Sequence, residues 1–431
     1  MRTYLKLRGV EELNSAILAF NISITNKEDI AMTASEKKPL VSGASRRKFL
    51  KGAGIAAATS TAAVILAGCD ENSEDVKKKK NQPSAPNISR AETVTLKVQS
   101  SWGSKSVFQE MAKQYVERVD KMSGGRLKID LLPAGAVVKA FQVQDACHKG
   151  VLDGAHTVTA YWYGKNKAAS LFGTGPVFGA NAAQILAWIH YGGGKDLYRE
   201  LVQDILKLNL VGFFCMPMPT QPLGWFKKEI RTTEDMKGIK YRTVGLATDI
   251  MQGMGLKVTQ LPGGEIIPAL ERGVIEAFEF NNPTSDRQFG AHDVSKNYML
   301  GSYHQAAEFF EIIFNKNRFE KLAPELQAIL EFSAEAANTA NYGFAMDNYS
   351  RDLQGLIKKD KVNVKRTPQA VMKAQLFSWD EVLKKLQKDP FFAKVVKSQK
   401  DWSYRVAFYD LMNAADYKLA FKHHFPNEIS F

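Results

Sequence analysis

The sequence predicts an α/β protein with two lobes, and three observations support this fold class. Of the 431 residues, 45% are hydrophobic and 24% are charged, as in a folded globular chain of two or three domains. From Val94 onward, segments with the period of a strand alternate with segments with the period of a helix. A helix–glycine–strand pattern occurs at 149–155 and again at 272–278, which indicates either two like lobes or a feature common to any such unit.

Residues 1–68 are predicted to be an export leader. A twin arginine at 46–47 precedes an apolar run at 52–64, and the leader ends in Leu-Ala-Gly before Cys69. This is the order of regions in a secretory signal. The twin arginine resembles a Tat signal, and the Leu-Ala-Gly-Cys stretch resembles a bacterial lipobox in which Cys69 would carry a lipid. A weak transmembrane anchor is the alternative.

A tether and a modest positive charge follow from the composition. Residues 69–92 contain a run of four lysines, no aromatic residue and almost no aliphatic residue, so they are predicted to be a flexible linker. The chain carries a net charge of +13, of which +8 remains after the leader. An exported protein with this excess attracts small anions, and we expect no nucleic-acid partner. The start codon is either Met1 or Met32.

Residues 93–213 are predicted to form the first α/β lobe. Alternating apolar residues indicate strands at 94–99 and 127–132, and apolar residues at helical spacing indicate a helix at 107–122 and a second helix that ends at Gly150. This order of strands and helices is typical of a mostly parallel sheet with helices on its faces.

Residues 214–307 are predicted to form the second lobe, which supplies polar residues at strand ends. A strand at 239–244 carries Arg242, and a strand at 274–280 carries Glu279. In two lobes joined by crossing connections, the carboxyl ends of the strands border a ligand cleft. An arginine there can hold a carboxylate through two parallel hydrogen bonds, although the spacing alone fits surface or ion-pair residues as well.

Common motifs of phosphate, metal and hydrolase sites do not occur in the sequence. The glycine-rich stretch at 192–195 is followed by aspartate and lacks the leading glycine of a phosphate-binding loop. The seven histidines have no metal-ligand spacing, and no Gly-x-Ser-x-Gly motif is present. Three cysteines exclude a disulfide scaffold, and we expect Cys147 and Cys215 to be buried small hydrophobic residues.

Nearly the whole chain, from about Thr93 to about Phe425, resembles the extracytoplasmic solute-binding subunits of tripartite ATP-independent periplasmic (TRAP) transporters, the DctP family. The most diagnostic stretches are Asp-Met-Lys-Gly-Ile-Lys-Tyr-Arg at 235–242 and Gly-Val-Ile-Glu-Ala at 273–277. Further matching stretches lie at 101–103, 123–129, 132–135, 149–151, 161–164, 224–229 and 269–272. The export leader fits the same assignment.

The resemblance implies a two-lobed periplasmic solute-binding fold in which the lobes close over a small carboxylate. Residues 308–431 would supply a return strand, a long helix that braces both lobes, and C-terminal helices. Arg242 matches the arginine that grips the ligand carboxylate, and we expect Trp102 and Tyr161 among the ligand-binding residues. His304 either lines the cleft or has a purely structural role.

The nearest subgroup of the family binds 2-oxo or 2-hydroxy monocarboxylates through a bound cation. Its ligand- and cation-binding residues correspond to Gln221, Glu279, Phe280 with its carbonyl group, and the position of Gln305. Gln305 is neutral where an acidic residue is usual, and Phe280 replaces a tryptophan. Because calcium sites prefer several carboxylates, we predict a weakened or altered site that takes sodium, calcium or no cation.

The predicted function is non-catalytic binding, in which the protein captures a small organic acid anion in the periplasm and delivers it to membrane permease subunits. A C4-dicarboxylate or another organic anion is the alternative ligand, and a Tat-exported enzyme is the alternative class of protein. The last helix, at about 403–423, is more apolar than one core-facing stripe requires. It either mediates a homodimer, as in some relatives, or packs across the chain's own lobes.

Overall fold

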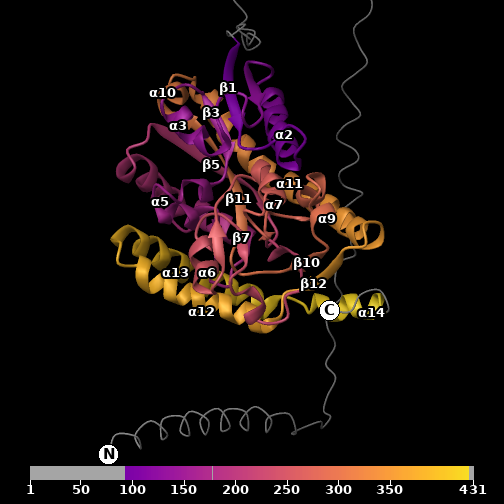
Figure 1. The fold of residues 1–431 in the computed structure, drawn as a ribbon. Coiled ribbons are helices and arrows are strands. Elements are labelled where there is room, and N and C mark those ends of the chain that lie inside the picture. The colour runs from indigo at the N-terminus through magenta and orange to yellow at the C-terminus, as the bar shows by residue number, and fades with distance from the viewer. Residues whose placement is uncertain (1–92, 177, 427–431) are drawn as a thin grey trace, which may run out of the picture. The chain divides into compact units, whose positions relative to one another are not determined.

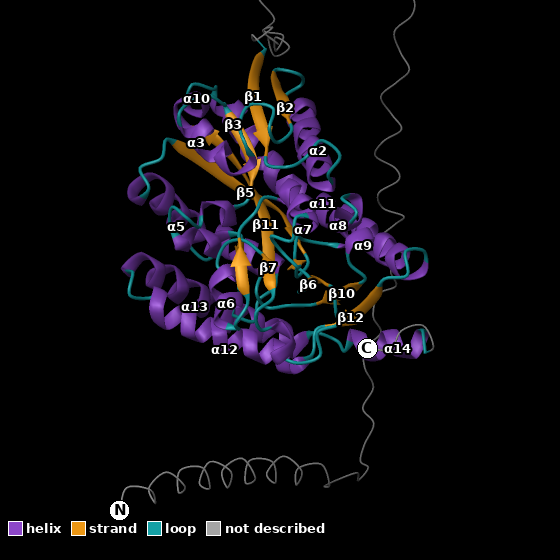
Figure 2. Ribbon diagram, in the orientation of Figure 1, coloured by secondary structure: helices purple, strands orange, loops and turns teal. Residues whose placement is uncertain are grey.

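The computed structural model describes residues 93–176 and 178–426 (Figure 1). The predicted leader, the tether up to residue 92 and the predicted lipid acceptor Cys69 lie outside the described residues. In the described part of the chain, helices surround two β-sheets (Figure 2), which confirms the predicted α/β fold class. None of the helices described here is long and apolar enough to cross a bilayer.

The first sheet has the strand order β2-β1-β3-β11-β4, with β5 pairing on β11. Its strands are β1 (Val94–Ser100), β2 (Leu127–Leu132), β3 (Gly154–Thr157), β4 (Thr174–Gly175), β5 (Leu210–Met218) and β11 (Ala307–Asn315). The strand β1 is parallel to β2 and to β3, as predicted. The strand β11 is antiparallel to β3, β4 and β5, and the chain reaches it only after most of the second sheet.

The second sheet has the strand order β12-β10-β6-β9-β7-β8. Its strands are β6 (Gly224–Phe226), β7 (Lys240–Arg242), β8 (Lys257–Thr259), β9 (Ala277–Phe278), β10 (Asn297–Leu300) and β12 (Asn363–Arg366). The strand β7 is parallel to both β8 and β9. In the β7–β9 pair Arg242 stands opposite Phe278, so the carboxyl ends of these two strands lie together.

Two extended connections carry the chain between the sheets. Residues 219–223 lead from β5 to β6, and residues 301–306 lead from β10 back to β11. The strand β5 belongs wholly to the first sheet, so the change of sheet falls at 219–223. The backbone N–H of Gln221 donates a hydrogen bond to the carbonyl of Gln305 over 3.3 Å. The two crossing segments therefore lie side by side.

The predicted long bracing helix is α11 (Pro324–Lys358). It starts with proline at the first turn, where the missing N–H costs nothing, and its 35 residues span about 50 Å at 1.5 Å per residue. It packs against β5 and α2 (Val107–Met122) beside the first sheet and against α8 (Pro283–Gln288) beside the second. One rigid element thus contacts both halves.

The remaining helices cover the sheets. The shorter ones are α3 (Val143–His148), α4 (Ala182–Tyr191), α5 (Gly194–Arg199), α6 (Ala247–Gly253), α7 (Ile266–Glu271), α9 (Ala291–Val294) and α10 (Lys316–Glu320). The C-terminal ones are α12 (Gln369–Leu386), α13 (Pro390–Asn413) and α14 (Tyr417–His424). The helix α12 packs on α6 (Figure 1), and α13 packs on α4. The single last helix predicted at 403–423 is wrong, since residues 414–416 interrupt it and the Asp416 side chain caps α14.

Apolar side chains fill both halves and the space under the helices. The largest buried side chains include Trp162 and Trp188 near the first sheet and Trp225 and Tyr298 in the second. Cys147 and Cys215 are completely buried and reduced. Burial raises the pKa of both thiols, which removes the reactive thiolate and confirms that these cysteines act as small hydrophobic residues.

Candidate ligand-binding site

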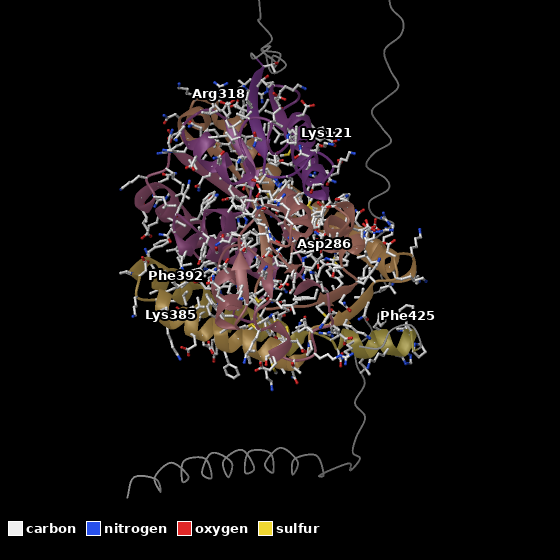
Figure 3. The ribbon with its side chains drawn as sticks, viewed as in Figure 1. Lys121, Asp286, Arg318, Lys385, Phe392 and Phe425 are labelled. Carbon is white, nitrogen blue, oxygen red and sulfur yellow. The ribbon has the colours of Figure 1, made fainter. Side chains whose placement is uncertain are left out.

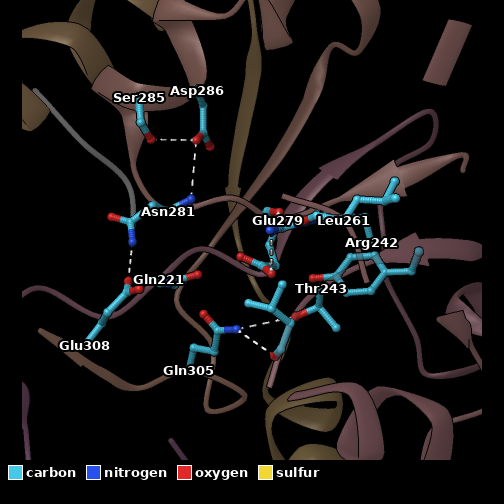
Figure 4. Close-up of polar contacts among 12 residues, drawn as sticks. Gln221, Arg242, Thr243, Leu261, Glu279, Asn281, Ser285, Asp286, Gln305 and Glu308 are labelled. Carbon is cyan, nitrogen blue, oxygen red and sulfur yellow. Dashed lines mark hydrogen bonds and ion pairs between the residues drawn. The ribbon is translucent and has the colours of Figure 1, made fainter. Parts of the chain in front are cut away.

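Arg242 occupies the last position of β7 and is 1% exposed. Its Nε donates to the carbonyl of Leu261 over 2.8 Å, and its Nη1 donates to the carbonyl of Glu279 over 2.7 Å. The same Nη1 lies 3.1 Å from Glu279 Oε1. The Tyr161 hydroxyl also interacts with this guanidinium. The strand end and these contacts therefore hold the arginine in one orientation (Figure 4).

Glu279 follows β9 directly and is completely buried. Its backbone N–H donates to the carbonyl of Arg242 over 3.2 Å, so the parallel pairing of β7 and β9 places the two charged side chains together. Burial raises the pKa of Glu279 to about 7, and the charge of Arg242 and a hydrogen bond from Thr243 partly offset this rise. Glu279 Oε2 is buried without a hydrogen-bond partner, which is costly unless a ligand supplies one.

Gln221 and Gln305 come from the two crossing segments and are both buried. Gln305 Nε2 donates to the carbonyl of Val244 over 3.2 Å and lies 3.4 Å from Thr243 Oγ1. Gln221 Nε2 donates to the carboxylate of Glu308. In both side chains the amide oxygen Oε1 is buried without a partner. The folded chain therefore brings Gln221, Gln305 and Glu279 to one place with three unpartnered oxygens.

Glu308 is a member of this cluster that the sequence reasoning missed. It lies in β11, is 5% exposed and accepts hydrogen bonds from Gln221 Nε2 and Asn281 Nδ2. Burial raises its pKa to about 8. The segment Ala-Glu-Phe-Phe-Glu-Ile-Ile-Phe-Asn has the composition of a fully buried strand, and two glutamates in such a strand are the signal that could have identified it.

The second of these glutamates, Glu311, lies elsewhere. Its Oε2 accepts a hydrogen bond of 2.8 Å from the hydroxyl of Tyr198 in the core of the first sheet. Burial raises its pKa well above the ordinary value. It therefore provides a buried acid on the same strand as Glu308 without contacting the cluster.

Another buried acid, Asp286, lies beside Asn281 (Figure 4), and Figure 3 marks its place in the whole molecule. It accepts hydrogen bonds from Trp225 Nε1 over 2.8 Å and from Ser285 Oγ over 2.9 Å. The backbone N–H of Asn281 lies 3.4 Å from Asp286 Oδ1. Burial raises the pKa of Asp286 to about 6. Asp286 thus anchors Asn281, which in turn holds Glu308.

Aromatic rings from both halves border the charged cluster. The guanidinium of Arg242 lies 5.6 Å from the centre of the Phe280 ring, which is within the range of a cation–π interaction. Phe280 thus makes this contact although it stands where the resemblance led us to expect a tryptophan. Trp102 and Tyr161 lie with ring centres 5.9 Å apart, and Phe108 lies 5.7 Å from Phe280. These contacts join the aromatic residues of the first half to Phe280 of the second.

A pocket of about 290 Å³ opens beside these rings. It is lined by residues 101–106 after β1, by Gly263 and Gly264 after β8, and by Phe280 and Phe289 after β9. It therefore lies at the carboxyl ends of strands from both sheets, where ligands bind in open α/β sheets. Its volume is close to the lower limit for a small-molecule site.

His304 is held mainly by structural contacts. It is completely buried, its Nδ1 lies 2.5 Å from Ser302 Oγ, and Ser302 in turn contacts Gln375 of α12. Burial lowers the pKa of His304 to about 3, so the ring is neutral at physiological pH. Its Nε2 is buried without a partner. One ring nitrogen is thus used by the fold and the other remains for a further contact.

The donor set of the cluster fits a hard cation. Within the described residues, no group of three or more His, Cys, Asp or Glu side chains is placed to hold a metal. The unpartnered oxygens of Gln221, Glu279 and Gln305 are two amide oxygens and one carboxylate oxygen. Sodium, calcium and magnesium prefer such oxygen ligands.

Two α/β halves joined by crossing segments, one helix packed on both, and a pocket at the strand ends of each half define a bacterial solute-binding protein. The DctP family, described as bacterial extracellular solute-binding protein, family 7, matches residues 98–390. The chain therefore belongs to this family. Its members are solute receptors of TRAP transporters and not enzymes, so the alternative of an exported enzyme is set aside.

Three relatives illustrate the family. The chain is 30% identical over 374 residues to a monocarboxylate 2-oxoacid-binding periplasmic protein of Nostoc sp., covering 86% of this chain and 98% of that protein. It is 27% identical to a TRAP solute-binding protein of Bordetella bronchiseptica with calcium and picolinate in a dimer, at a TM-score of 0.72 and coverage of 78% and 97%. It is 28% identical to a TRAP solute-binding protein of Pseudoalteromonas atlantica with sodium and pyruvate, at a TM-score of 0.70 and coverage of 78% and 100%.

Proposed function

We propose that this protein captures a small 2-oxo or 2-hydroxy monocarboxylate and delivers it to the membrane subunits of a TRAP transporter. The observation that carries the proposal is the buried pair of Arg242 and Glu279 with three unpartnered oxygens around it. Arg242 provides the donors for a carboxylate. The Nostoc relative, named for 2-oxoacid binding, and the pyruvate bound in the Pseudoalteromonas relative support this class of ligand.

A bound cation completes the proposed site. Gln221, Glu279, Gln305 and the carbonyl of Phe280 would hold it, and the cation would supply positive charge for the oxygens of the acid. The relatives contain either sodium or calcium, and the mixture of amide and carboxylate oxygens suits both ions. The aromatic side chains of Trp102, Tyr161 and Phe280 and the neutral His304 would enclose the apolar part of the ligand.

The two sheets are proposed to form the cores of two lobes that close over the acid. The crossing segments at 219–223 and 301–306 would act as hinges, and α11 would brace both lobes. Closure requires a ligand that binds the closed form more tightly than the open form. A ligand that bridges Arg242 in the second lobe and the aromatic residues of the first meets this requirement.

The receptor is proposed to reach the periplasm by the Tat route and to remain attached to the membrane through a lipid on Cys69. The twin arginine at 46–47 and the Leu-Ala-Gly-Cys stretch support this route. Replacing both arginines by lysine should leave the precursor in the cytoplasmic fraction. The Cys69→Ser variant should lose metabolic labelling by palmitate, and labelling that persists in this variant contradicts the proposed lipid site.

The C-terminal helices are proposed to form a homodimer. Within α13 and α14, large apolar side chains are exposed to solvent. They are Tyr404, Phe408, Tyr409, Leu411, Met412, Tyr417 and Leu419, with exposed fractions between 62% and 84%. Monomeric soluble proteins rarely expose an apolar surface of this extent, and a second copy of the chain would cover it.

Ligand binding tests the proposed function. Purified protein is first treated with EDTA, and calorimetry then measures binding of pyruvate, lactate, picolinate and a C4-dicarboxylate in NaCl, in CaCl₂ and in choline chloride. We expect 2-oxo and 2-hydroxy monocarboxylates to bind and the cation to strengthen binding. Preferential binding of the dicarboxylate would replace the proposed ligand class, and the absence of binding by every acid would refute the function.

A further inference from the structure

Glu308 joins three segments of the chain that are far apart in the sequence. It lies in β11 of the first sheet, while Gln221 lies in the first crossing segment and Asn281 follows β9 of the second sheet. Gln221 Nε2 and Asn281 Nδ2 both donate to the same oxygen, Glu308 Oε2 (Figure 4). Because only 5% of Glu308 is exposed, water has little access to these hydrogen bonds.

The chemistry of a carboxylate determines how the Gln221 amide is oriented. Glu308 Oε2 accepts both hydrogen bonds and has no proton to donate, whether the carboxyl group is ionised or carries its proton on Oε1, whereas an amide has a donating NH₂ group and an accepting oxygen. Gln221 must therefore present its nitrogen to Glu308, and its oxygen is left unpartnered. The carbonyl of Val244 has the same effect on Gln305. An amide without such a partner could rotate and present NH₂ to a cation.

Asn281 keeps Glu308 in place. Its backbone N–H contacts Asp286, its Oδ1 accepts a hydrogen bond of 2.7 Å from Asn282 Nδ2, and its own Nδ2 donates to Glu308. Asp286 is held in turn by Trp225. The carboxylate of Glu308 is thus fixed by a buried network that does not depend on the ligand.

We propose that Glu308 is a positioning residue of the cation site. It holds the amide of Gln221 so that the oxygen, and not the nitrogen, remains for the cation. This inference rests on the proposed cation-dependent binding of an organic acid. In this role Glu308 keeps the site able to bind a cation.

Two variants test the role of Glu308. Glu308→Met has a side chain of similar length without an acceptor, so Gln221 loses its constraint. The paired exchange Gln221→Glu with Glu308→Gln retains one carboxylate and moves it to position 221. Because both terminal atoms of a carboxylate are oxygens, the side chain at position 221 then presents an oxygen to the cation whichever way it is rotated. In this exchange the new amide at position 308 donates to the new carboxylate at position 221 and accepts from Asn281. Glu311→Gln is the matched control, because Glu311 lies on the same strand, is equally buried and contacts Tyr198 instead.

Calorimetry with calcium alone and with calcium plus pyruvate provides the measurement. We expect Glu308→Met to weaken calcium binding by at least about tenfold, as for other residues that orient metal ligands, and the paired exchange to recover most of this loss. Glu311→Gln should bind as wild type does. Recovery by exchange of the pair separates positioning from a structural role, and it keeps the test valid if Glu308→Met does not fold.

The outcomes distinguish this inference from the proposed function. Wild-type protein that binds an organic acid equally well in EDTA and in calcium overturns the cation site and the role of Glu308 with it. Cation-dependent wild-type binding that is unchanged in Glu308→Met overturns only the role of Glu308. A paired exchange that folds, as judged by circular dichroism, and still fails to bind calcium also overturns it.

Discussion

The side chains of Arg242 and Glu279 are almost fully buried, with Nη1 and Oε1 3.1 Å apart. Removing two charges from water costs several kcal/mol per ion, which their attraction offsets only with further hydrogen bonds. The carbonyls of Leu261 and Glu279 supply such bonds to the guanidinium, but Glu279 Oε2 has no partner. An incompletely satisfied pair of this kind is better explained by ligand binding than by a contribution to stability.

Arg242→Lys should weaken pyruvate binding by about a hundredfold. Lysine keeps the charge but lacks the planar fork that binds a carboxylate through two parallel hydrogen bonds. A charge-assisted hydrogen bond contributes about 1.5–3 kcal/mol, and about 1.4 kcal/mol corresponds to tenfold in affinity. Calorimetry at saturating cation measures the change. Arg287→Lys, which alters a surface ion pair with Asp352 and Asp360, should bind normally, and equal affinity of both variants would contradict the assignment of Arg242.

The ligand-free protein should become less stable as the pH rises from about 6.5 to about 8 in EDTA. Burial raises the pKa of Glu279 to about 7 and of Glu308 to about 8, so the folded state binds more protons than the unfolded state in this window and loses stability as the protons leave. The pKa of His156 and His304 is lowered to about 3, so these residues oppose the trend only below about pH 6.5.

Thermal unfolding at several pH values checks this prediction. The melting temperature should fall across the window in wild type and fall less in Glu308→Gln, which removes one of the buried carboxyl groups with a raised pKa. A melting temperature that rises steadily to about pH 8 in wild type would show that the buried carboxyl groups do not carry raised pKa values. Saturating calcium and pyruvate should flatten the dependence, because the ligands bind the ionised forms.

At the scale of elements, the strand β6 positions the crossing segment that carries Gln221. Gly224 opens this strand with φ of +123°, and a Cβ atom there would lie 2.2 Å from the carbonyl oxygen of Phe278 in β9. Only glycine adopts this conformation without strain and permits the two backbones to approach so closely. The positions of Gln221, which precedes β6, and of Glu279, which follows β9, therefore depend on the pairing of these two strands.

Gly224→Ala should destabilise the protein by about 2–4 kcal/mol, because strained backbone and displacement of β9 both add to the cost. Urea unfolding followed by circular dichroism measures the free energy of unfolding. Gly343→Ala is the matched control: Gly343 is exposed within α11, and a Cβ atom there meets nothing within 4 Å. That variant should gain up to about 1 kcal/mol, and a similar loss in both variants would contradict the packing argument.

Periodicity predicted the elements well and their pairing less well. The strands at 94–99 and 127–132 and the helix at 107–122 lie within a residue of the predicted bounds. The interruption at 414–416 escaped prediction because apolar spacing continues across it. The antiparallel course of β11 escaped it too, since strand direction depends on where the chain has been and not on local residues.

At the scale of the whole molecule, the exposed apolar surface of α13 and α14 bears on assembly. Deleting residues 414–431 removes α14 and should convert a dimer into a monomer in size-exclusion chromatography with light scattering. Pyruvate affinity should stay the same, because Arg242 and Glu279 belong to the second sheet and its borders. A wild-type protein that is already monomeric at micromolar concentration would contradict the proposed dimer.

Much of the ligand site could be predicted because its residues sit in recognisable local motifs. Arg242 ends a stretch that resembles the DctP family, and Glu279 follows the Gly-Val-Ile-Glu-Ala stretch. Both lie at the ends of strands that the sequence predicted, and the structure shows that these strands are parallel neighbours. Gln221 and Gln305 came from the resemblance alone, and the backbone bond between their segments had no counterpart in any local pattern.

The sequence by itself determined the family, the α/β class, the long helix and the arginine and glutamate of the site, because each depends on contiguous residues and their periodicity. Only the tertiary structure decided that Glu308 joins Gln221 and Asn281, which are 87 and 27 residues away. Contacts over such separations depend on the path of the chain between them. The carboxyl group that contacts Gln221 is therefore one that only the folded protein places there.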